Sequence, residues 1–291
     1  MSKSWAVMAE EERMEVASRR NLLIVDGLNL AFRFKDKGGA FAANYVRTIF
    51  SLAQSYSAKD ILFTTDSGKS KYRTDIFPEY KANREEKRAN LTEEERAKDQ
   101  EFFKQYKDEV LTLLATKLNV VKCKGVEADD LAAYAIMKLE DKYDHIWLVS
   151  TDGDWDTMLS ANVSRFSFTT RKEYRLADFY EQHECDTPEQ FADLKAIMGD
   201  LGDNIRGVEG IGKKRGYNVL REHGSVLDIL DAIPLPGKQA YIRNLNESAE
   251  ILERNLMLVD LRSFCVDAIR AASEEFFVEY DAMLSNMGAD V

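Results

Sequence analysis

The sequence predicts an α/β fold with a mostly parallel sheet and flanking helices, and two patterns carry this prediction. Short runs rich in β-branched and aromatic residues, each typical of a buried strand, recur between residues 21 and 168. Helical patterns lie between them, and strands that alternate with helices form parallel sheets with crossover helices. The expected strands are 21–26, 60–66, 119–123, 145–152 and 163–168, and the clearest helices between them are 43–56 and 130–140.

Residues 79–118 interrupt this alternation. Charged side chains crowd the segment, and an apolar face develops only near Phe102 and Phe103. A helix that is polar on nearly all sides has no apolar face to bury against a core. We therefore expect a mostly solvated helical segment that projects from the core.

Beyond about residue 186 the strand patterns stop. Short helical patterns with glycine-rich turns follow, which predicts a second, helical region. The expected organisation is an N-terminal arm over 1–18, a core over 19–185 and a C-terminal helical region over 186–291.

Composition narrows the classes of protein. The chain has 291 residues, of which 45% are apolar and 31% charged, as in a globular protein with a real core. No apolar run approaches the roughly 20 residues of a membrane helix, and the N-terminus lacks the apolar stretch of a signal peptide. Three widely spaced cysteines, Cys123, Cys185 and Cys265, exclude a disulfide framework. We expect a cytoplasmic protein that does not enter a membrane.

The net charge of −11 argues against a nucleic-acid partner, but the distribution of the charges along the chain is compatible with one. Residues 204–221 hold five basic side chains and one acid, and residues 69–90 hold seven basic and four acidic ones. Basic patches on an acidic protein are compatible with phosphate binding if the acids serve another purpose.

Acidic side chains cluster where the expected strands end. Asp26, Asp66 and Asp152 each close a strand, and the carboxyl ends of parallel strands are where such sheets bind ligands. Further acids follow these strands or lie in a later turn: Glu127, Asp129, Asp130, Asp154, Asp156, Asp200 and Asp203. Carboxylates that converge repel one another unless a cation neutralises them or some stay protonated, and oxygen ligands in this number suit Mg²⁺ or Mn²⁺.

Other roles for these acids fit the sequence less well. Asp156 is better explained as a helix cap or turn residue. The run from Asp152 to Asp156 opens like a calcium loop, but Thr157 and Val163 stand where Gly and Glu are required. A glycosidase pair needs only two carboxylates and leaves the rest unexplained. On a helical turn, Asp200 and Asp203 would share one face.

Residues 207–216, GVEGIGKKRG, form a glycine-rich loop. A nucleotide-binding P-loop fails because Lys214 replaces the required Ser or Thr, and a dinucleotide fingerprint fails because Gly216 comes one residue late. A helix–hairpin–helix over about 195–222 remains, with Lys213, Lys214 and Arg215 at the start of its second helix. Exposed backbone N–H groups there would grip a nucleic-acid backbone without reading sequence. An ordinary helical turn with solvated charges stays the alternative.

The segment PEYKANR places three further candidates at the foot of residues 79–118. Lys81 and Arg84 lie one turn apart and can point at one phosphate, and Tyr80 could stack on a base. A solvated surface helix is the alternative. The histidines His145, His183 and His223 lie outside every motif and are expected to be structural.

These motifs together resemble those of the 5′-nuclease family, which includes flap endonucleases and the 5′–3′ exonuclease domains of bacterial DNA polymerases. The similarity is greatest to the free-standing enzymes of tailed bacteriophages and runs from about residue 19 to 262. The segments that carry it are IVDG at 24–27, PEYKANR at 78–84, GVEADD at 125–130, STDGDWD at 150–156, GDLGDNI at 199–205 and GVEGIGKKRG at 207–216.

The resemblance implies two divalent ions, Mg²⁺ or Mn²⁺, and a role for each group of residues. One ion would be held by Asp66, Glu127 and Asp129, and the other by Asp130, Asp152, Asp154, Asp200 and Asp203, several of them through water. Asp26 would act from outside the ligand shell, and Lys81 and Arg84 would contact the scissile phosphate. Residues 79–118 would arch over a single-stranded 5′ end. The DNA contacts would come from Tyr80, Lys195, Arg206, Gly210, Gly212, Lys213, Lys214 and Arg215, with a K⁺ ion in the hairpin loop.

The activity that the resemblance implies is a structure-specific 5′-nuclease, both 5′–3′ exonuclease and flap endonuclease. It would cut branched or 5′-ended DNA as a monomer and leave 5′-phosphates, in phage DNA replication and flap processing. Two alternatives stay open. One is a relative that removes RNA primers from RNA–DNA hybrids, and the other is a DNA-binding module without catalysis.

Overall fold

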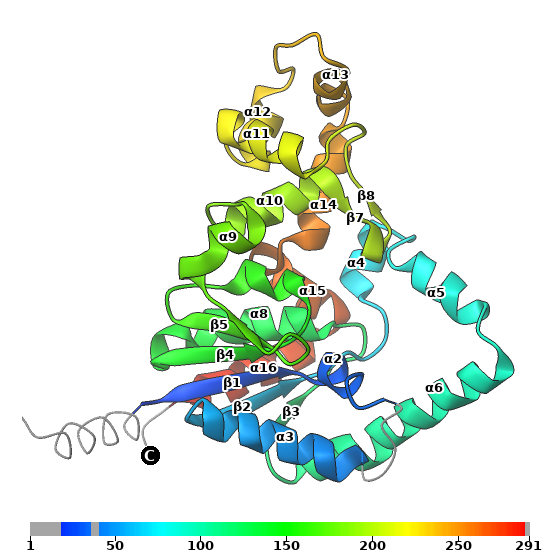
Figure 1. Ribbon diagram of the computed structural model, residues 1–291, viewed down its shortest axis with the longest axis vertical. Coiled ribbons are helices and arrows are strands. Elements are labelled where there is room, and N and C mark those ends of the chain that lie inside the picture. The colour runs from blue at the N-terminus through cyan, green and yellow to red at the C-terminus, as the bar shows by residue number, and fades with distance from the viewer. Residues whose placement is uncertain (1–18, 36–40, 289–291) are drawn as a thin grey trace, which may run out of the picture.

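The computed structural model describes residues 19–35 and 41–288, so the expected arm over 1–18 lies outside the described residues. A six-stranded sheet in the order β3-β2-β1-β4-β5-β6 forms its centre (Figure 1). The strands are β1 Asn21–Asp26, β2 Ala58–Thr64, β3 Asn119–Val121, β4 His145–Val149, β5 Val163–Ser167 and β6 Lys172–Tyr174. All neighbours run parallel except β5 and β6. The predicted α/β fold with a mostly parallel sheet is confirmed.

Strand β6 was not predicted. Its three residues, Lys172, Glu173 and Tyr174, are too few and too polar to show a strand pattern. Arg171, with φ of 57°, ends the turn that folds β6 back antiparallel onto β5. A short charged strand at the sheet edge also discourages pairing with another chain.

The register of the central strands brings their carboxyl ends into line. Asp26 pairs with Thr64 of β2, and Val25 pairs with Val149 of β4. Residues that follow β1, β2 and β4 therefore emerge at one edge of the sheet. Helix α8 (Ala128–Leu139) begins at that same edge, since the backbone N–H of Ala128 donates to the Asp66 carboxylate over 2.8 Å.

Both faces of the sheet are covered, as the uninterrupted apolar run of β1 requires. Alternate residues of β1 point to opposite sides: Leu23 and Val25 pack with α2 (Gly27–Ala31), α3 (Phe41–Ser55), η1 (Tyr106–Leu111) and α7 (Thr112–Ala115). Leu22 and Ile24 pack with α8 and with two C-terminal helices, α15 (Leu261–Ala272) and α16 (Glu274–Asn286).

Residues 261–286 were expected in the separate C-terminal region, and the structure places them instead against the sheet's own helix α8. Their buried apolar side chains, which include Leu261, Ile269 and Leu284, complete the layer on that face. The chain therefore leaves the core after β6 and returns to it. No helix within the described ranges has the length and apolar character to cross a membrane.

The charged segment after helix α4 (Lys71–Ile76) is helical and projects from the body, as expected (Figure 1). It consists of α5 (Ala82–Ala89) and α6 (Glu93–Gln105), and none of the residues of α5 is buried. Thr92 and Glu95 close a capping box at the start of α6. Phe102 and Tyr106 return the chain to the core. We call α5 and α6 the arch.

The second region is built from short elements around its own apolar core. These are η4 Leu176–Asp178, α9 Phe179–His183, α10 Pro188–Met198, β7 Gly199–Asp200, η5 Leu201–Asp203, β8 Ile205–Arg206, α11 Lys213–His223, α12 Val226–Ala232, α13 Ala240–Asn246 and α14 Ala249–Val259. In the first region, η2 (Glu140–Lys142) follows α8 and η3 (Gly153–Met158) follows β4.

The expectation that strands stop at residue 186 is wrong, because β7 and β8 form a small antiparallel hairpin. Asp200 and Asp203 lie on this hairpin and its 3-10 turn rather than on an α-helix. Gly199 has φ of 75°, and a side chain there would approach the backbone N of Gly207 to 2.3 Å. Because both positions are glycine, the backbone that leaves α10 at Gly199 can lie this close to the backbone that leaves β8 at Gly207.

The start of α2 gives a prediction about stability. A methyl group at Gly27 would lie 2.3 Å from the Phe63 ring and 2.7 Å from the Tyr106 hydroxyl, both in the core. Gly27→Ala should therefore lose about 1–3 kcal/mol in urea unfolding. Gly212→Ala is the control because nothing lies within 4 Å of its added methyl group. Equal stability of the two variants would contradict the close packing.

Candidate active site

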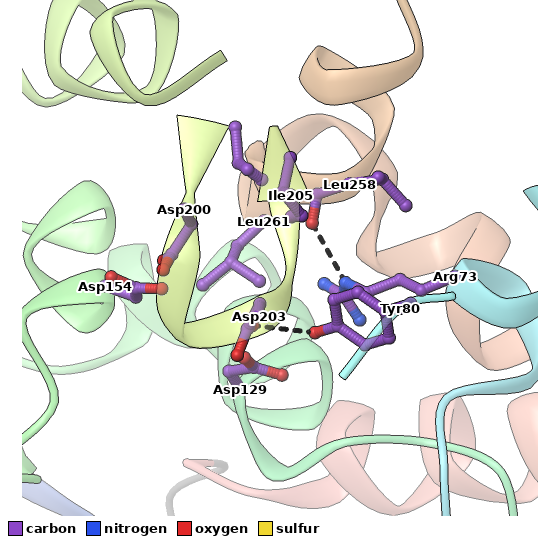
Figure 2. Close-up of a pocket in the computed structure, with 10 residues that line it drawn as sticks. Arg73, Tyr80, Asp129, Asp154, Asp200, Asp203, Ile205, Leu258 and Leu261 are labelled. Carbon is purple, nitrogen blue, oxygen red and sulfur yellow. Dashed lines mark hydrogen bonds between the residues drawn. The ribbon is translucent and has the colours of Figure 1, made fainter. Parts of the chain in front are cut away.

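Acidic side chains from distant parts of the chain meet at the carboxyl edge of the sheet. They come from the ends of β1 and β2, the start of α8, the loop after β4 and the β7–β8 hairpin. Four of them, Asp129, Asp154, Asp200 and Asp203, line one pocket together with Arg73 and Tyr80 (Figure 2). We call the nine acids Asp26, Asp66, Glu127, Asp129, Asp130, Asp152, Asp154, Asp200 and Asp203 the carboxylate cluster.

Glu127 is held by groups at the foot of the arch. One carboxylate oxygen accepts a hydrogen bond from the Lys81 ammonium at 2.7 Å, and the other accepts from the Tyr80 hydroxyl at 2.9 Å. Burial alone would raise the pKa of Glu127, but Lys81 and Arg73 together hold it below its usual value. Glu127 is therefore ionised at neutral pH.

Asp203 completes the same arrangement from the other side. Its carboxylate accepts from Arg84 at 2.5 Å, and the Tyr80 hydroxyl and the Lys81 ammonium lie 3.0 and 3.6 Å away. Tyr80 is only 3% exposed. The prediction that Tyr80 stacks on a base is therefore wrong, because its ring is buried and its hydroxyl joins Glu127 to Asp203.

Asp130 has a different partner from the one expected. Both of its oxygens accept hydrogen bonds from the Arg73 guanidinium, at 2.6 and 2.8 Å. Arg73 also donates to the Leu258 carbonyl at 2.9 Å. A carboxylate with both oxygens bound to Arg73 holds α8 against α4 and is not placed to ligate a metal ion. Sequence reasoning missed Arg73, since one basic residue among seven in 69–90 gives no separate signal.

Lys195 also differs from its predicted role as a DNA contact. It is 8% exposed, and its ammonium bonds to Asp154 and lies 3.1 Å from Asp200. Helix α10 thus provides a buried cation between the loop after β4 and the β7–β8 hairpin. A buried ammonium with two carboxylate partners neutralises part of the carboxylate cluster and is not exposed for a DNA contact.

Asp26, the last residue of β1, is buried. Its carboxylate accepts from the Ser150 hydroxyl at 2.7 Å and from the backbone N–H of Asn29 at 3.3 Å. Burial, with added repulsion from Asp66 and Asp152, raises the pKa of Asp26 to about 8. A protonated Asp26 reduces the local negative charge at neutral pH.

The remaining acids show that the cluster carries more negative charge than its cations neutralise. Burial and the neighbouring Asp130 raise the pKa of Asp129 well above its usual value, and burial and Asp154 raise that of Asp152. Among residues 19–35 and 41–288, no three His, Cys, Asp or Glu side chains surround one point closely enough to hold a metal ion. Lys81 and Lys195 instead bridge pairs of carboxylates.

The donor set nevertheless fits divalent cations. Carboxylate oxygens are the ligands that Mg²⁺ and Mn²⁺ prefer. Burial is the main cause of these raised pKa values and repulsion adds to it, and a dication would favour the ionised form against both. The acids with the chemistry to hold such ions are Asp66, Glu127, Asp129, Asp152, Asp154, Asp200 and Asp203. Asp156 stands apart, because its buried carboxylate is bound to Arg165 and His183.

The predicted helix–hairpin–helix segment, about 195–222, runs from the last turn of α10 through the β7–β8 hairpin and the glycine-rich loop into α11. Gly216 of α11 sits against Leu194 of α10, where a methyl group would come within 2.6 Å of the leucine. Gly210 has φ of 79°, as a turn glycine should, and the position of a side chain at Gly212 faces open space. The two helices thus pack closely around an open loop.

The basic residues of this segment differ in their contacts. Arg206 and Lys214 are exposed. Lys213 lies 3.1 Å from the Glu184 carboxylate. The Arg215 guanidinium donates to the Gly210 carbonyl at 2.7 Å and lies over the Tyr241 ring, so part of its bonding capacity stabilises the loop itself.

Comparison with known proteins agrees with this architecture. Residues 21–184 match the family described as 5′-3′ exonuclease, N-terminal resolvase-like domain, and residues 186–273 match 5′-3′ exonuclease, C-terminal SAM fold. The chain is 60% identical over 277 residues to the flap endonuclease of Escherichia phage T5, covering 94% of this chain and 95% of the relative. It is 28% identical over 229 residues, 74% of its length, to DNA polymerase I of Bacillus caldotenax, of which it spans 25%.

Two solved structures of the phage T5 D15 protein are also similar. One was co-crystallised with metal ions and superposes with a TM-score of 0.88 at 58% identity, covering 91% of this chain and 98% of the other. The other is a pseudo-enzyme–product complex with DNA and metal ions, with a TM-score of 0.89 at 56% identity, covering 92% and 99%.

The raised pKa of Asp26 predicts how stability changes with pH. In the folded chain Asp26 keeps its proton to about pH 8, whereas in the unfolded chain it loses it near pH 4. Its contribution to stability is therefore complete below pH 4 and is lost as pH rises toward 8, by up to about 1.4 kcal/mol per pH unit. Asp26→Asn should lose less stability than wild type between pH 5 and 8.

Urea unfolding at several pH values in the presence of a chelator measures this difference. The exposed Asp231 on α12 supplies the control, and Asp231→Asn should keep the wild-type slope. Parallel pH profiles for wild type and Asp26→Asn would contradict the buried, protonated state of Asp26.

Proposed function

The chain belongs to the 5′–3′ exonuclease family, and we propose that it is a structure-specific 5′-nuclease that hydrolyses DNA at 5′ ends and 5′ flaps. One observation carries the proposal. The carboxylate cluster meets Lys81 and Arg84 at the foot of the arch, so acids suited to metal ions lie beside cations suited to a phosphate.

Two divalent ions would complete the site. Asp66, Glu127 and Asp129 would hold one, and Asp152, Asp154, Asp200 and Asp203 the other. When bound, Mg²⁺ or Mn²⁺ supplies an activated water at neutral pH and positive charge for the leaving oxygen. Asp26, bound to Ser150 and Asn29, would act from outside the ligand shell.

Lys81 and Arg84 would bind the scissile phosphate. Lys81 has φ of 57°, and its backbone N–H donates to the Asp203 carbonyl at 2.9 Å, so the β7–β8 hairpin fixes where the arch begins. Asn83 donates to the Leu201 carbonyl at 2.9 Å and adds a second tie. A positioned ammonium and guanidinium can stabilise charge that develops on a phosphate in the transition state without reorganising.

The open loop and α11 would hold duplex DNA. Three cations, Lys213, Lys214 and Arg215, begin α11, where the helix dipole favours an anion over a cation. A phosphate bound at this N-terminus would neutralise the three cations. It would also accept hydrogen bonds from the backbone N–H groups near Gly210 and Gly212. Arg206 would extend the contact, and a K⁺ ion could lie among the loop carbonyls.

The substrate and setting follow from the same reasoning. Acids at the cleavage site repel DNA, so the loop and arch must supply the binding, which favours branched or 5′-ended DNA with a 5′ strand under the arch. We propose that the product carries a 5′-phosphate. We also propose that the protein acts as a monomer in phage DNA replication and flap processing, in the host cytoplasm.

A labelled 5′-flap substrate tests this function. Wild type should cut it with Mg²⁺ and not with EDTA, and Asp152→Asn should lower the single-turnover rate by orders of magnitude because a metal ligand is lost. Asp231→Asn, an exposed acid remote from the site, should retain the wild-type rate. Binding without cleavage under all conditions would instead indicate a DNA-binding module, and cleavage confined to RNA–DNA hybrids would indicate a primer-removing relative.

Lys81 gives a prediction about the phosphate contact. Lys81→Ala should lower the single-turnover rate by roughly 10²–10³-fold, because a positioned charge in the transition state is lost. DNA affinity should fall far less, since one phosphate contact among several mainly alters affinity and its salt dependence. The matched control is Lys59→Ala, an exposed lysine near the opposite end of β2. An unchanged rate in Lys81→Ala would remove Lys81 from the reaction.

A further inference from the structure

Asp156 is a fully buried acid for which the proposed reaction has no use. Its carboxylate is 0% exposed and accepts hydrogen bonds from the Arg165 guanidinium at 2.5 and 2.7 Å. The His183 ring donates to the same carboxylate through its Nε2–H, at 2.9 Å. Neither Asp156 nor His183 lines the pocket at the carboxylate cluster, yet burying a charge is costly unless its partners are held in good geometry.

Arg165 joins the two ends of one loop. Besides Asp156, it donates to the Ser150 carbonyl at 3.0 Å. Ser150 and Asp156 flank Asp152 and Asp154, two of the acids proposed to hold an ion. Arg165 itself lies on β5, inside the sheet, with its guanidinium over the Tyr174 ring. One rigid side chain therefore fixes the span of the loop 150–156.

His183 connects this loop to the second region. It ends α9, and its ring lies 4.2 Å from the ring of Phe191 on α10. Helix α10 also carries Lys195, which bonds to Asp154 and Asp200. A series of contacts thus runs from Arg165 through Asp156 and His183 to α10. Helix α10 leads into the β7–β8 hairpin, which carries Asp200 and Asp203.

We infer that Arg165, Asp156 and His183 form a positioning cluster that sets the distance between the loop 150–156 and the β7–β8 hairpin, and thereby the affinity of the carboxylate cluster for divalent cations. This inference rests on the proposed function. Groups that orient metal ligands without touching the metal commonly change metal affinity 10–100-fold when they are removed. The three residues are positioning residues, because their hydrogen bonds join them to one another and to the Ser150 carbonyl rather than to the acids proposed as ligands.

Mn²⁺ binding measured by calorimetry, without DNA, tests the cluster independently of activity. His183→Phe keeps a ring against Phe191 and removes the hydrogen-bond donor to Asp156, so it should bind Mn²⁺ about tenfold more weakly than wild type. His183→Gln restores a donor at a similar reach and should recover most of that affinity. Asp156→Asn is the harsher change, because it leaves the buried Arg165 without a counter-charge.

The control removes a buried hydrogen bond elsewhere. Tyr280→Phe on α16 loses the bond from its hydroxyl to the Leu131 carbonyl, 2.8 Å long. It should lower stability to an extent similar to His183→Phe and leave Mn²⁺ affinity unchanged. Mn²⁺ affinity of His183→Phe within twofold of wild type, or an equal loss in Tyr280→Phe, would overturn the positioning cluster.

The two proposals fail in different ways. If wild type binds Mn²⁺ but does not cut a 5′ flap, the nuclease proposal fails, while the order wild type, His183→Gln, His183→Phe in affinity still supports the positioning cluster. If wild type cuts the flap and His183→Phe binds Mn²⁺ as wild type does, the positioning cluster alone fails. A wild type that binds no Mn²⁺ overturns both.

Discussion

Repulsion among nine carboxylates at one edge of the sheet is the constraint on which the rest of this structure depends. Parallel strands in register deliver Asp26, Asp66 and the residues after β4 to the same place, and like charges so close together would separate if the backbone allowed it. The fold resists because β1 and β4 are buried between two layers of helices, whose packing outweighs the local electrostatic cost. Burial, with repulsion from neighbouring acids added to it, raises the pKa of Asp26, Asp129 and Asp152, and these raised values reflect that cost.

The structure offsets this repulsion with cations that come from outside the sheet. Arg73 from α4, Lys81 and Arg84 from the foot of the arch, and Lys195 from α10 each bond to carboxylates of the cluster. Each of these elements is thereby tied to the site by charge as well as by apolar contact. These ion pairs at the sheet edge therefore also help to anchor the arch and the second region.

The parts of this arrangement that sequence could predict are those with a local pattern. The five main strands, the solvated arch and the acids at strand ends follow from periodicity and from strand polarity alone. Tyr80 and Lys195 were assigned to DNA because exposure cannot be read from a residue type, and both are buried by partners distant in the chain. Arg73 has no separate signal among the seven basic residues of 69–90, and the Asp156–His183 bond joins residues 27 positions apart, so neither could be found from a local pattern. The β7–β8 hairpin was missed because the close approach of Gly199 to Gly207 is a tertiary contact.

Under the proposed function, the same cations must serve two partners in turn. Lys81 and Arg84 now neutralise Glu127 and Asp203, which are acids proposed to hold ions. Divalent ions at those acids would release the two side chains toward a phosphate, and a phosphate that binds them would release the acids toward ions. Binding of metal and binding of DNA would then favour each other, since each removes the competing partner of the other. Arg165 bonds to Asp156 and to the Ser150 carbonyl and takes no part in this exchange, so it would keep the loop between Ser150 and Asp156 in place while the partners change.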